Sequence, residues 1–109
     1  MREKLQKIYI IGSISDLSKS DAIEKFNIAS LLLKFNGYEP VTPIELCSDV
    51  SDNILFDDIE HRIELLSRCD GIFLLRDWEE SIISIIEKKI GEIIKSYNSL
   101  FEIVYEKDI

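Results

Sequence analysis

Residues that could do chemistry gather where an apolar run of the chain ends and a helix is predicted to begin. The run Gly71–Leu75 is followed by a polar turn that holds Asp77 and Trp78, and the predicted helix starts at about Ser81. In an open α/β sheet, ligands bind beside the carboxyl ends of parallel strands. We therefore expect a small molecule to bind at this turn. Trp78 could stack on a flat ring or form a pocket wall, and its structural alternatives are a loop anchor or a dimer contact.

Glu87 is the acidic residue of this segment with the clearest chemical potential. It lies about two turns into the predicted helix and has isoleucines on both sides in the sequence. A carboxylate in apolar surroundings can have a raised pKa or act as a nucleophile. Helical periodicity alone favours a different interpretation, a solvated carboxylate paired with Lys88 or Lys89. Glu79 and Glu80 are predicted to lie in the first helical turn as capping groups, where the helix dipole favours carboxylates.

A second polar turn follows the apolar run Lys7–Ile11, which is predicted to be a buried first strand. Gly12 would let the backbone approach a ligand closely, and Ser13 could donate to a phosphate or sugar oxygen. The structural alternative is a tight turn that needs a glycine. No dinucleotide-binding glycine fingerprint and no P-loop accompanies it. Because the two strands are predicted neighbours, this turn should lie next to Asp77 and Trp78.

The elements that must position these residues alternate between strand and helix. Two further strands are predicted over Tyr38–Pro43 and over Leu100–Tyr105. The first of these is expected at a sheet edge because it contains Pro40. Helices are predicted from Ser20 or Asp21 to Asn36, from Asp57 or Asp58 to Arg68, and from Ser81 to Tyr97. This order predicts one α/β domain over residues 1–109, a flavodoxin- or Rossmann-like three-layer sandwich. Its parallel sheet should have four or five strands in the order 2-1-3-4.

The charge and composition exclude several classes of function. The chain carries 21 acidic and 13 basic residues, a net charge of −8, and has no basic run, so a nucleic-acid polymer is not an expected partner. A single phosphate at a helix N-terminus remains compatible with this charge. No apolar run approaches the roughly 20 residues that cross a bilayer, and no signal peptide precedes the first strand. We therefore expect a cytoplasmic protein without a membrane partner.

Metal ligands are scarce in this sequence. Cys47 and Cys69 lack the spacing of a metal site and are expected to be free or buried thiols. His61 is the single histidine, and both it and Arg62 are predicted on the solvated face of their helix. The sequence therefore predicts neither a metal site nor a cofactor.

Five short segments along the chain carry motifs of a known superfamily. Tyr9–Ser13 resembles an opening Tyr-Ile-Ala-Gly-Pro, and Gly12–Ile14 is similar to the Gly-Ser-Ile of deoxynucleoside monophosphate N-glycosidases. Phe26–Ala29 resembles Phe-Asn-x-Ala, and Gly37–Pro43 resembles Gly-Tyr-x-Val-x-Asn-Pro. Cys69–Ser81 resembles Cys-Asp-x-Ile-x-Leu-Leu-Pro-Gly-Trp-Glu-x-Ser. Over nearly its whole length the chain thus resembles the nucleoside 2-deoxyribosyltransferase-like superfamily, in a small and mostly uncharacterised bacterial and phage branch.

This resemblance implies a flavodoxin-like fold and cleavage or transfer of an N-glycosidic bond. Its helix glutamate, which attacks the anomeric carbon and forms a glycosyl-enzyme ester, matches Glu87. Ser81 matches the residue that helps to hold the base or phosphate. Tyr9 and the Gly12–Ser13 turn match the sugar-contacting strand end. The implied ligand is a nucleoside or nucleotide, and the implied assembly is a homodimer.

Three departures from the family pattern keep a second hypothesis open. Ile82–Ile83 replaces a segment that contains glycine, Arg76–Asp77 replaces Pro-Gly, and Arg62 stands where an aspartate is usual, with Asp58 as a possible substitute. The first hypothesis is a nucleoside or deoxynucleotide N-glycosidic hydrolase or transferase. The alternative is a catalytically lapsed nucleotide-binding protein or a dimeric interaction protein, with the isoleucine-rich helix as its interface.

Overall fold

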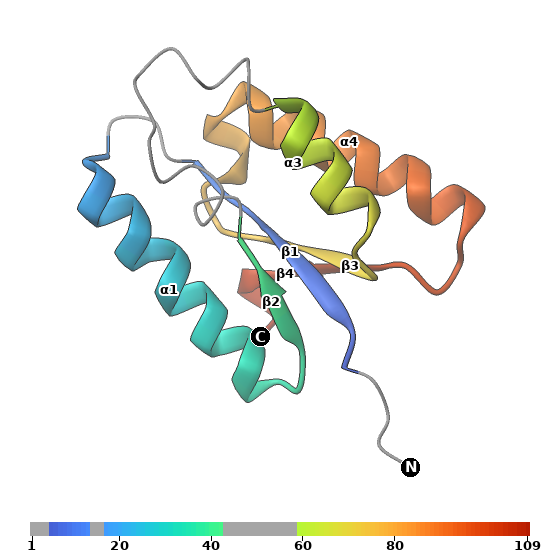
Figure 1. Cartoon of the computed structure of the whole chain (residues 1–109), viewed down its shortest axis with the longest axis horizontal. Helices are drawn as coiled ribbons and strands as arrows, with labels where there is room; N and C mark the ends of the chain where they lie inside the picture. The colour runs from blue at the N-terminus through green and yellow to red at the C-terminus, as the bar shows by residue number, and fades with distance from the viewer. Residues whose placement is uncertain (1–4, 14–16, 43–58) are drawn as a thin grey trace.

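The computed structural model describes residues 5–13, 17–42 and 59–109, and Asp58, Cys47 and Ile14 lie outside these ranges. A parallel four-stranded sheet forms its centre, in the order β2-β1-β3-β4 (Figure 1). The strands are β1 (Lys7–Ile11), β2 (Glu39–Val41), β3 (Gly71–Leu74) and β4 (Glu102–Tyr105). The predicted α/β class, parallel sheet and strand order are confirmed, and β2 with its proline lies at an edge as predicted.

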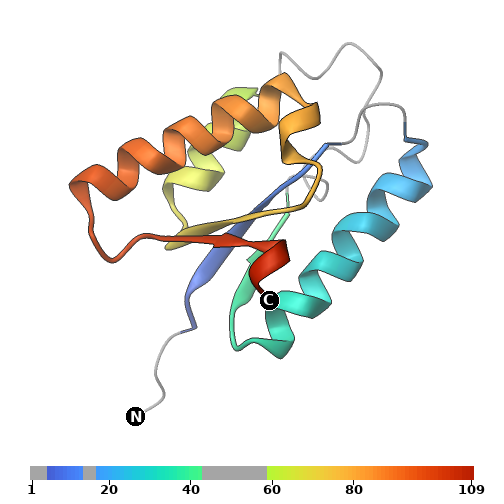
Figure 2. The same ribbon diagram turned by 180° about the vertical axis from the view of Figure 1, so that it is seen from behind.

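Three helices cover the two faces of this sheet. Helix α1 (Lys19–Phe35) lies on one face, and α3 (Ile59–Ser67) and α4 (Ile82–Tyr97) lie side by side on the other (Figure 1). The described residues also form two short 3-10 helices, η2 (Trp78–Glu80) and η3 (Glu106–Asp108). Seen from behind, η3 brings the C-terminus to the side of α1 (Figure 2). None of the described helices is long and apolar enough to cross a membrane.

The helix boundaries follow from local capping chemistry. Helix α1 starts earlier than predicted, because the extended residue Ser18 caps it and accepts a hydrogen bond from the Asp21 amide at 3.1 Å. Gly37 follows that helix with a φ of +84°, which confirms the predicted left-handed cap. Ser81 caps α4, which begins at Ile82, one residue after the predicted start. The prediction that Glu79 and Glu80 lie in its first turn is wrong, since both belong to η2 and are exposed.

The core divides into two clusters because successive strand side chains point to opposite faces. Along β1, Ile8 and Ile10 face α1, whereas Tyr9 and Ile11 face α3 and α4. We call the first side the α1 face and the second the α3–α4 face. The buried cluster on the α1 face consists of Ile8, Ile10, Phe26, Ala29, Leu33, Phe73 and Leu75. The cluster on the α3–α4 face consists of Tyr9, Ile11, Leu66, Cys69, Ile72, Leu74 and Phe101.

Candidate functional site

Helix α4 turns an unusual stripe of residues toward the sheet. Its buried positions are Ser84, Glu87 and Gly91, which recur three and four residues apart and so share one helical face. A Cβ atom on Gly91 would lie 2.6 Å from Cδ1 of Ile72, so this glycine permits the helix to lie close to β3. The close approach brings Glu87, only 2% exposed, down onto the sheet.

Glu87 meets the side chain of Tyr9 there. Tyr9 lies in the middle of β1, is fully buried, and its hydroxyl donates a hydrogen bond to Oε2 of Glu87. The predicted solvated carboxylate paired with Lys88 or Lys89 is therefore wrong. Lys88 instead lies 4.7 Å from the ring centroid of Trp78, as a cation–π contact on the flank of the helix. The structure thus brings together two of the predicted site residues, Tyr9 and Glu87.

Arg62 on α3 is the third charged or polar group in this layer. The predicted solvated position is wrong for Arg62, which is only 6% exposed, and correct for its neighbour His61, which is exposed. The reason is helical spacing: Arg62 lies four residues before the fully buried Leu66 and so shares its face. The Nε atom of Arg62 is buried without a hydrogen-bond partner among the described residues.

These surroundings raise the pKa of Glu87 from 4.5 to about 7. Burial is the largest cause, because it disfavours the charged carboxylate. The Tyr9 hydrogen bond and the positive charge of Arg62 act in the opposite direction and lower the pKa. Glu87 is therefore poised between its acid and carboxylate forms near neutral pH, which is the range in which an acid, a base or a nucleophile is useful.

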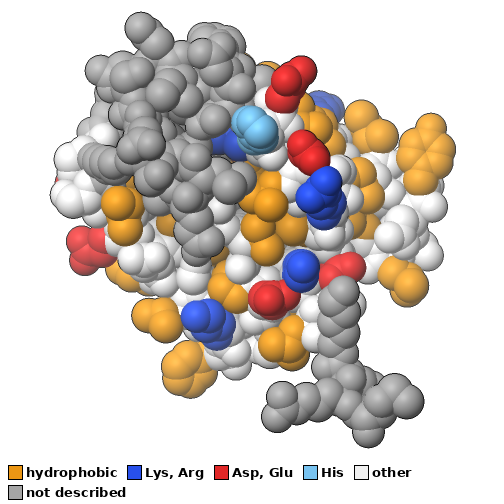
Figure 3. All heavy atoms as spheres, viewed as in Figure 1, with side chains coloured by type: hydrophobic (Ala, Val, Ile, Leu, Met, Phe, Trp, Pro, Cys, Tyr) orange, Lys and Arg blue, Asp and Glu red, His pale blue; other side chains and the backbone are white. Residues whose placement is uncertain are grey.

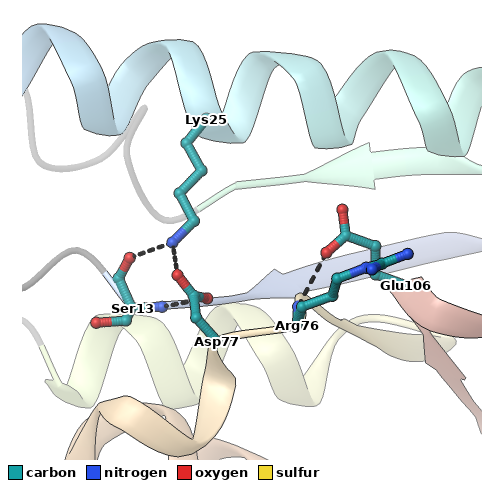
Figure 4. A network of polar contacts seen from close by, with 5 residues as sticks. All are labelled: Ser13, Lys25, Arg76, Asp77 and Glu106. Carbon is teal, nitrogen blue, oxygen red and sulfur yellow. Dashed lines mark hydrogen bonds and ion pairs between the residues drawn. The ribbon is translucent and has the colours of Figure 1, made fainter.

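A second polar group lies at the carboxyl ends of β1 and β3, on the α1 face (Figure 4). The Lys25 ammonium donates to the Ser13 carbonyl at 2.7 Å and forms an ion pair with Asp77, whose other oxygen accepts from the Ser13 amide at 3.3 Å. The predicted proximity of the two turns is thus confirmed. This group borders a cavity of about 220 Å³ that is also lined by Ile28, Ala29, Leu75, Arg76 and Glu106.

The remaining predicted site residues have structural contacts of their own. A Cβ atom on Gly12 would lie 2.5 Å from Cδ1 of Leu75, so that glycine makes room for a core side chain. Trp78 packs against the α3–α4 cluster. The Ser81 hydroxyl accepts from the Ser84 amide at 3.3 Å. Ligand contacts by these residues stay predictions, and Asp58 lies outside the described residues.

The sequence-based predictions did not name Lys25 and placed Arg62 on the solvated side of its helix, and the structure makes both residues prominent. Lys25 bonds both polar turns, and it lies four residues before the buried Ala29 on the sheet-facing side of α1. Arg62 likewise lies four residues before a buried apolar residue, Leu66. In both cases a basic residue that falls on the apolar stripe of a helix was the available indication.

Thiol and metal chemistry have little basis in the described part of the chain. Cys69 is buried and free, and burial raises the pKa of its thiol to about 11, so it stays protonated at neutral pH. The described residues contain no group of three or more His, Cys, Asp or Glu side chains that could hold a metal ion.

Comparison with protein families gives one match, and no curated protein and no solved structure matches the chain. The model of a domain of unknown function, DUF4406, matches residues 6–97. The chain belongs to this family. The matched range includes Tyr9, Arg62 and Glu87, so these three buried residues of the α3–α4 face all lie within the DUF4406 domain.

Proposed function

We propose that this DUF4406 protein hydrolyses or transfers the N-glycosidic bond of a nucleoside or deoxynucleotide, with Glu87 as the nucleophile. The observation that carries the proposal is the buried Glu87 carboxyl group, held by the Tyr9 hydroxyl on the neighbouring strand. A pKa of about 7 leaves a large fraction of Glu87 ionised at neutral pH. The resemblance to nucleoside 2-deoxyribosyltransferases, in which the matching glutamate attacks the sugar, supports the same role.

In the proposed reaction, the Glu87 carboxylate attacks the anomeric carbon of the sugar. A carbon–oxygen bond forms, the carbon–nitrogen bond breaks, and its electron pair leaves with the base, which takes up a proton. Water then hydrolyses the glycosyl ester, or a second base accepts the sugar. The Tyr9 hydrogen bond to Oε2 orients the carboxylate so that its other oxygen can attack.

The test is release of the free base from a panel of deoxynucleosides and their 5′-monophosphates, followed by chromatography. We expect release by the wild-type protein and none by Glu87→Ala or Glu87→Gln. Glu92→Gln is the matched control, because Glu92 lies on the same helix with its side chain 45% exposed. In a working enzyme, mass spectrometry of the denatured protein should also detect the sugar ester on Glu87. Base release that is unchanged in the Glu87 variants would contradict the mechanism.

A second candidate is a nucleotide-binding protein without turnover, and Arg62 is the observation that favours it. This buried cation stands where the resembling branch has an aspartate, so the support expected around the nucleophile has changed. The departure at Ile82 does not support this candidate, because Ile82 is 77% exposed and does not fill the layer around Glu87. Folded protein that binds a nucleotide of the panel but releases no base would establish this function.

A further inference from the structure

The side chain of Arg62 is buried, and its Nε atom has no hydrogen-bond partner among the described residues. No described carboxylate forms an ion pair with it. Burial of a charged group is costly unless it is paired and hydrogen-bonded. Such a group is therefore well explained if its partner belongs to a bound ligand.

Two described carboxylates, one on the same helix as Arg62 and one across the layer, are engaged elsewhere. Glu64 on the same helix pairs with Arg68 at 2.6 Å, on the exposed side of α3. Glu87, across on α4, accepts its hydrogen bond from Tyr9. The charge of Arg62 reaches Glu87 strongly enough to lower the pKa of that carboxyl group, although the two form no ion pair. Arg62 thus lies near Glu87, and its Nε–H donor has no partner among the described residues.

We propose that Arg62 binds an oxyanion of the ligand, a phosphate or a carboxylate, between α3 and α4 beside Glu87. A guanidinium group offers a planar fork of donors that fits both oxyanions, and charge-assisted hydrogen bonds of this kind are about twice as strong as neutral ones. This assigns an acidic ligand to the α3–α4 face. It concerns the same site as the proposed function but does not depend on N-glycosidic chemistry.

A bound oxyanion must change the protonation of Glu87. The groups that face Glu87 from the elements packed against it are Tyr9 on β1 and Arg62 on α3. The anion cancels the charge of Arg62 and adds a negative charge of its own, so the pKa of Glu87 rises further. Binding near pH 7 is therefore coupled to proton uptake by Glu87. An anion held by exposed lysines or arginines elsewhere would lack this coupling.

The test uses the full chain with inorganic phosphate and with acetate as probes. Isothermal titration at pH 7 in two buffers of different ionisation enthalpy measures affinity and proton uptake together. We expect binding with proton uptake by the wild-type protein, loss of uptake in Glu87→Gln, and affinity at least about tenfold weaker in Arg62→Met. Arg62→Lys should keep part of the affinity. Arg68→Met is the matched control, because Arg68 lies on the same helix but is exposed, and it should bind like the wild type.

A second measurement keeps the inference testable if Arg62→Met does not fold. The Nε–H resonance of Arg62 in the wild-type protein should move downfield and exchange more slowly with water when the probe binds. Tighter binding of phosphate than of acetate would assign a phosphate ligand, and the reverse a carboxylate. Equal affinity in Arg62→Met and the wild type, or an unchanged Nε–H resonance, would mean an adventitious ion only and overturn the inference. Base release without Arg62-dependent binding would support the proposed function and contradict this inference. Arg62-dependent binding without base release would support this inference and contradict the proposed function.

Discussion

The two faces of the sheet are built from the same strands but are packed by different rules. On the α1 face the buried cluster under the helix is apolar, and the polar group of Ser13, Lys25 and Asp77 lies beyond it at the strand ends. On the α3–α4 face, Tyr9, Arg62, Ser84 and Glu87 are all buried. Burial of such groups costs free energy, whereas burial of apolar side chains supplies it. The comparison indicates that the α1 face mainly stabilises the fold and that the α3–α4 face gives up stability to hold a site.

On the face of the molecule in Figure 3, acidic and basic side chains are mixed among the described residues. The contrast between the two faces of the sheet rests on buried residues, so substitutions of buried residues are the way to test it.

The largest expected effect is a loss of stability on the α1 face. Leu33→Ala removes a side chain with 0% exposure, and it should lower the free energy of unfolding by about 2–5 kcal/mol, measured by urea denaturation. Leu31→Ala is the matched control on the same helix, since Leu31 is 60% exposed, and its effect should stay within about 0.5 kcal/mol. Similar losses in both variants would mean that the α1 face is not the stabilising one.

The second effect is a pH dependence of stability that Glu87 confers on the α3–α4 face. Its pKa is raised to about 7 in the folded protein, so the folded state holds the proton more tightly than the unfolded chain. The free energy of unfolding should therefore fall as the pH rises from about 4.5 to about 7, by about 3 kcal/mol, and level off above that range.

Glu87→Gln should remove this contribution, because the amide does not titrate. Denaturation at pH 5 and pH 8 measures the difference, and Glu92→Gln, on the exposed side of the same helix, should keep the wild-type dependence. Equal pH dependence in the wild type and Glu87→Gln would show that Glu87 is not the buried acid responsible.

A smaller effect is expected from the hydroxyl that holds Glu87. Tyr9→Phe removes the hydrogen bond that lowers the pKa of Glu87, so that pKa should rise above the wild-type value, at a cost of about 1–2 kcal/mol in stability. Carbon-13 NMR of the Glu87 carboxyl group measures the titration directly. Tyr38→Phe is the control, because Tyr38 donates to Glu102 on the α1 face, and it should leave the Glu87 titration unchanged.

The smallest effect on stability concerns the outer side of α4. Ile82, Ile85, Ile86 and Ile93 are exposed there, and the sequence predicts a homodimer through this helix. Light scattering should then give twice the mass of one chain for the wild type and a single-chain mass for Ile86→Lys, with monomer stability changed by about 0.5 kcal/mol or less. Ile28→Lys is the control, because Ile28 is an exposed isoleucine on α1, and this variant should remain dimeric. A wild-type monomer would contradict the dimer and leave the comparison of the two faces intact.

The fold could be predicted because its signals are local and redundant. Two short apolar runs became β1 and β3, and Pro40 placed β2 at an edge, since proline cannot donate to a neighbouring strand on both sides. Gly37 ended α1 as predicted, because capping depends on a few neighbouring atoms, and α4 begins within one residue of its predicted start. Ser18 shows the limit of this approach, since several polar residues in succession could each have capped α1.

The site was harder to predict because it depends on the rotation of two helices about their axes. The isoleucines of helix α4 gather mostly on one side of it, but this side is not the one that lies deepest on the sheet. The buried side proved to be the one with Ser84, Glu87 and Gly91, while several isoleucines are exposed. Close packing, allowed by the missing Cβ of Gly91, overrode the hydrophobic pattern. The isoleucine neighbours of Glu87 and the family resemblance both pointed to this residue, but neither could predict which side of the helix is buried.

The contact between Gly91 and Ile72 also predicts how this family can vary. Any side chain at position 91 must take space from Cδ1 of residue 72, at 2.6 Å from the added atom. Members of the family with alanine or serine at the position of Gly91 should therefore carry valine or alanine at that of Ile72. If residue 72 stays an isoleucine beside a larger residue 91, either its Cδ1 must move aside or the helix must shift outward and carry its glutamate away from the strand tyrosine. The two positions should therefore evolve as a pair in members that keep that tyrosine and glutamate.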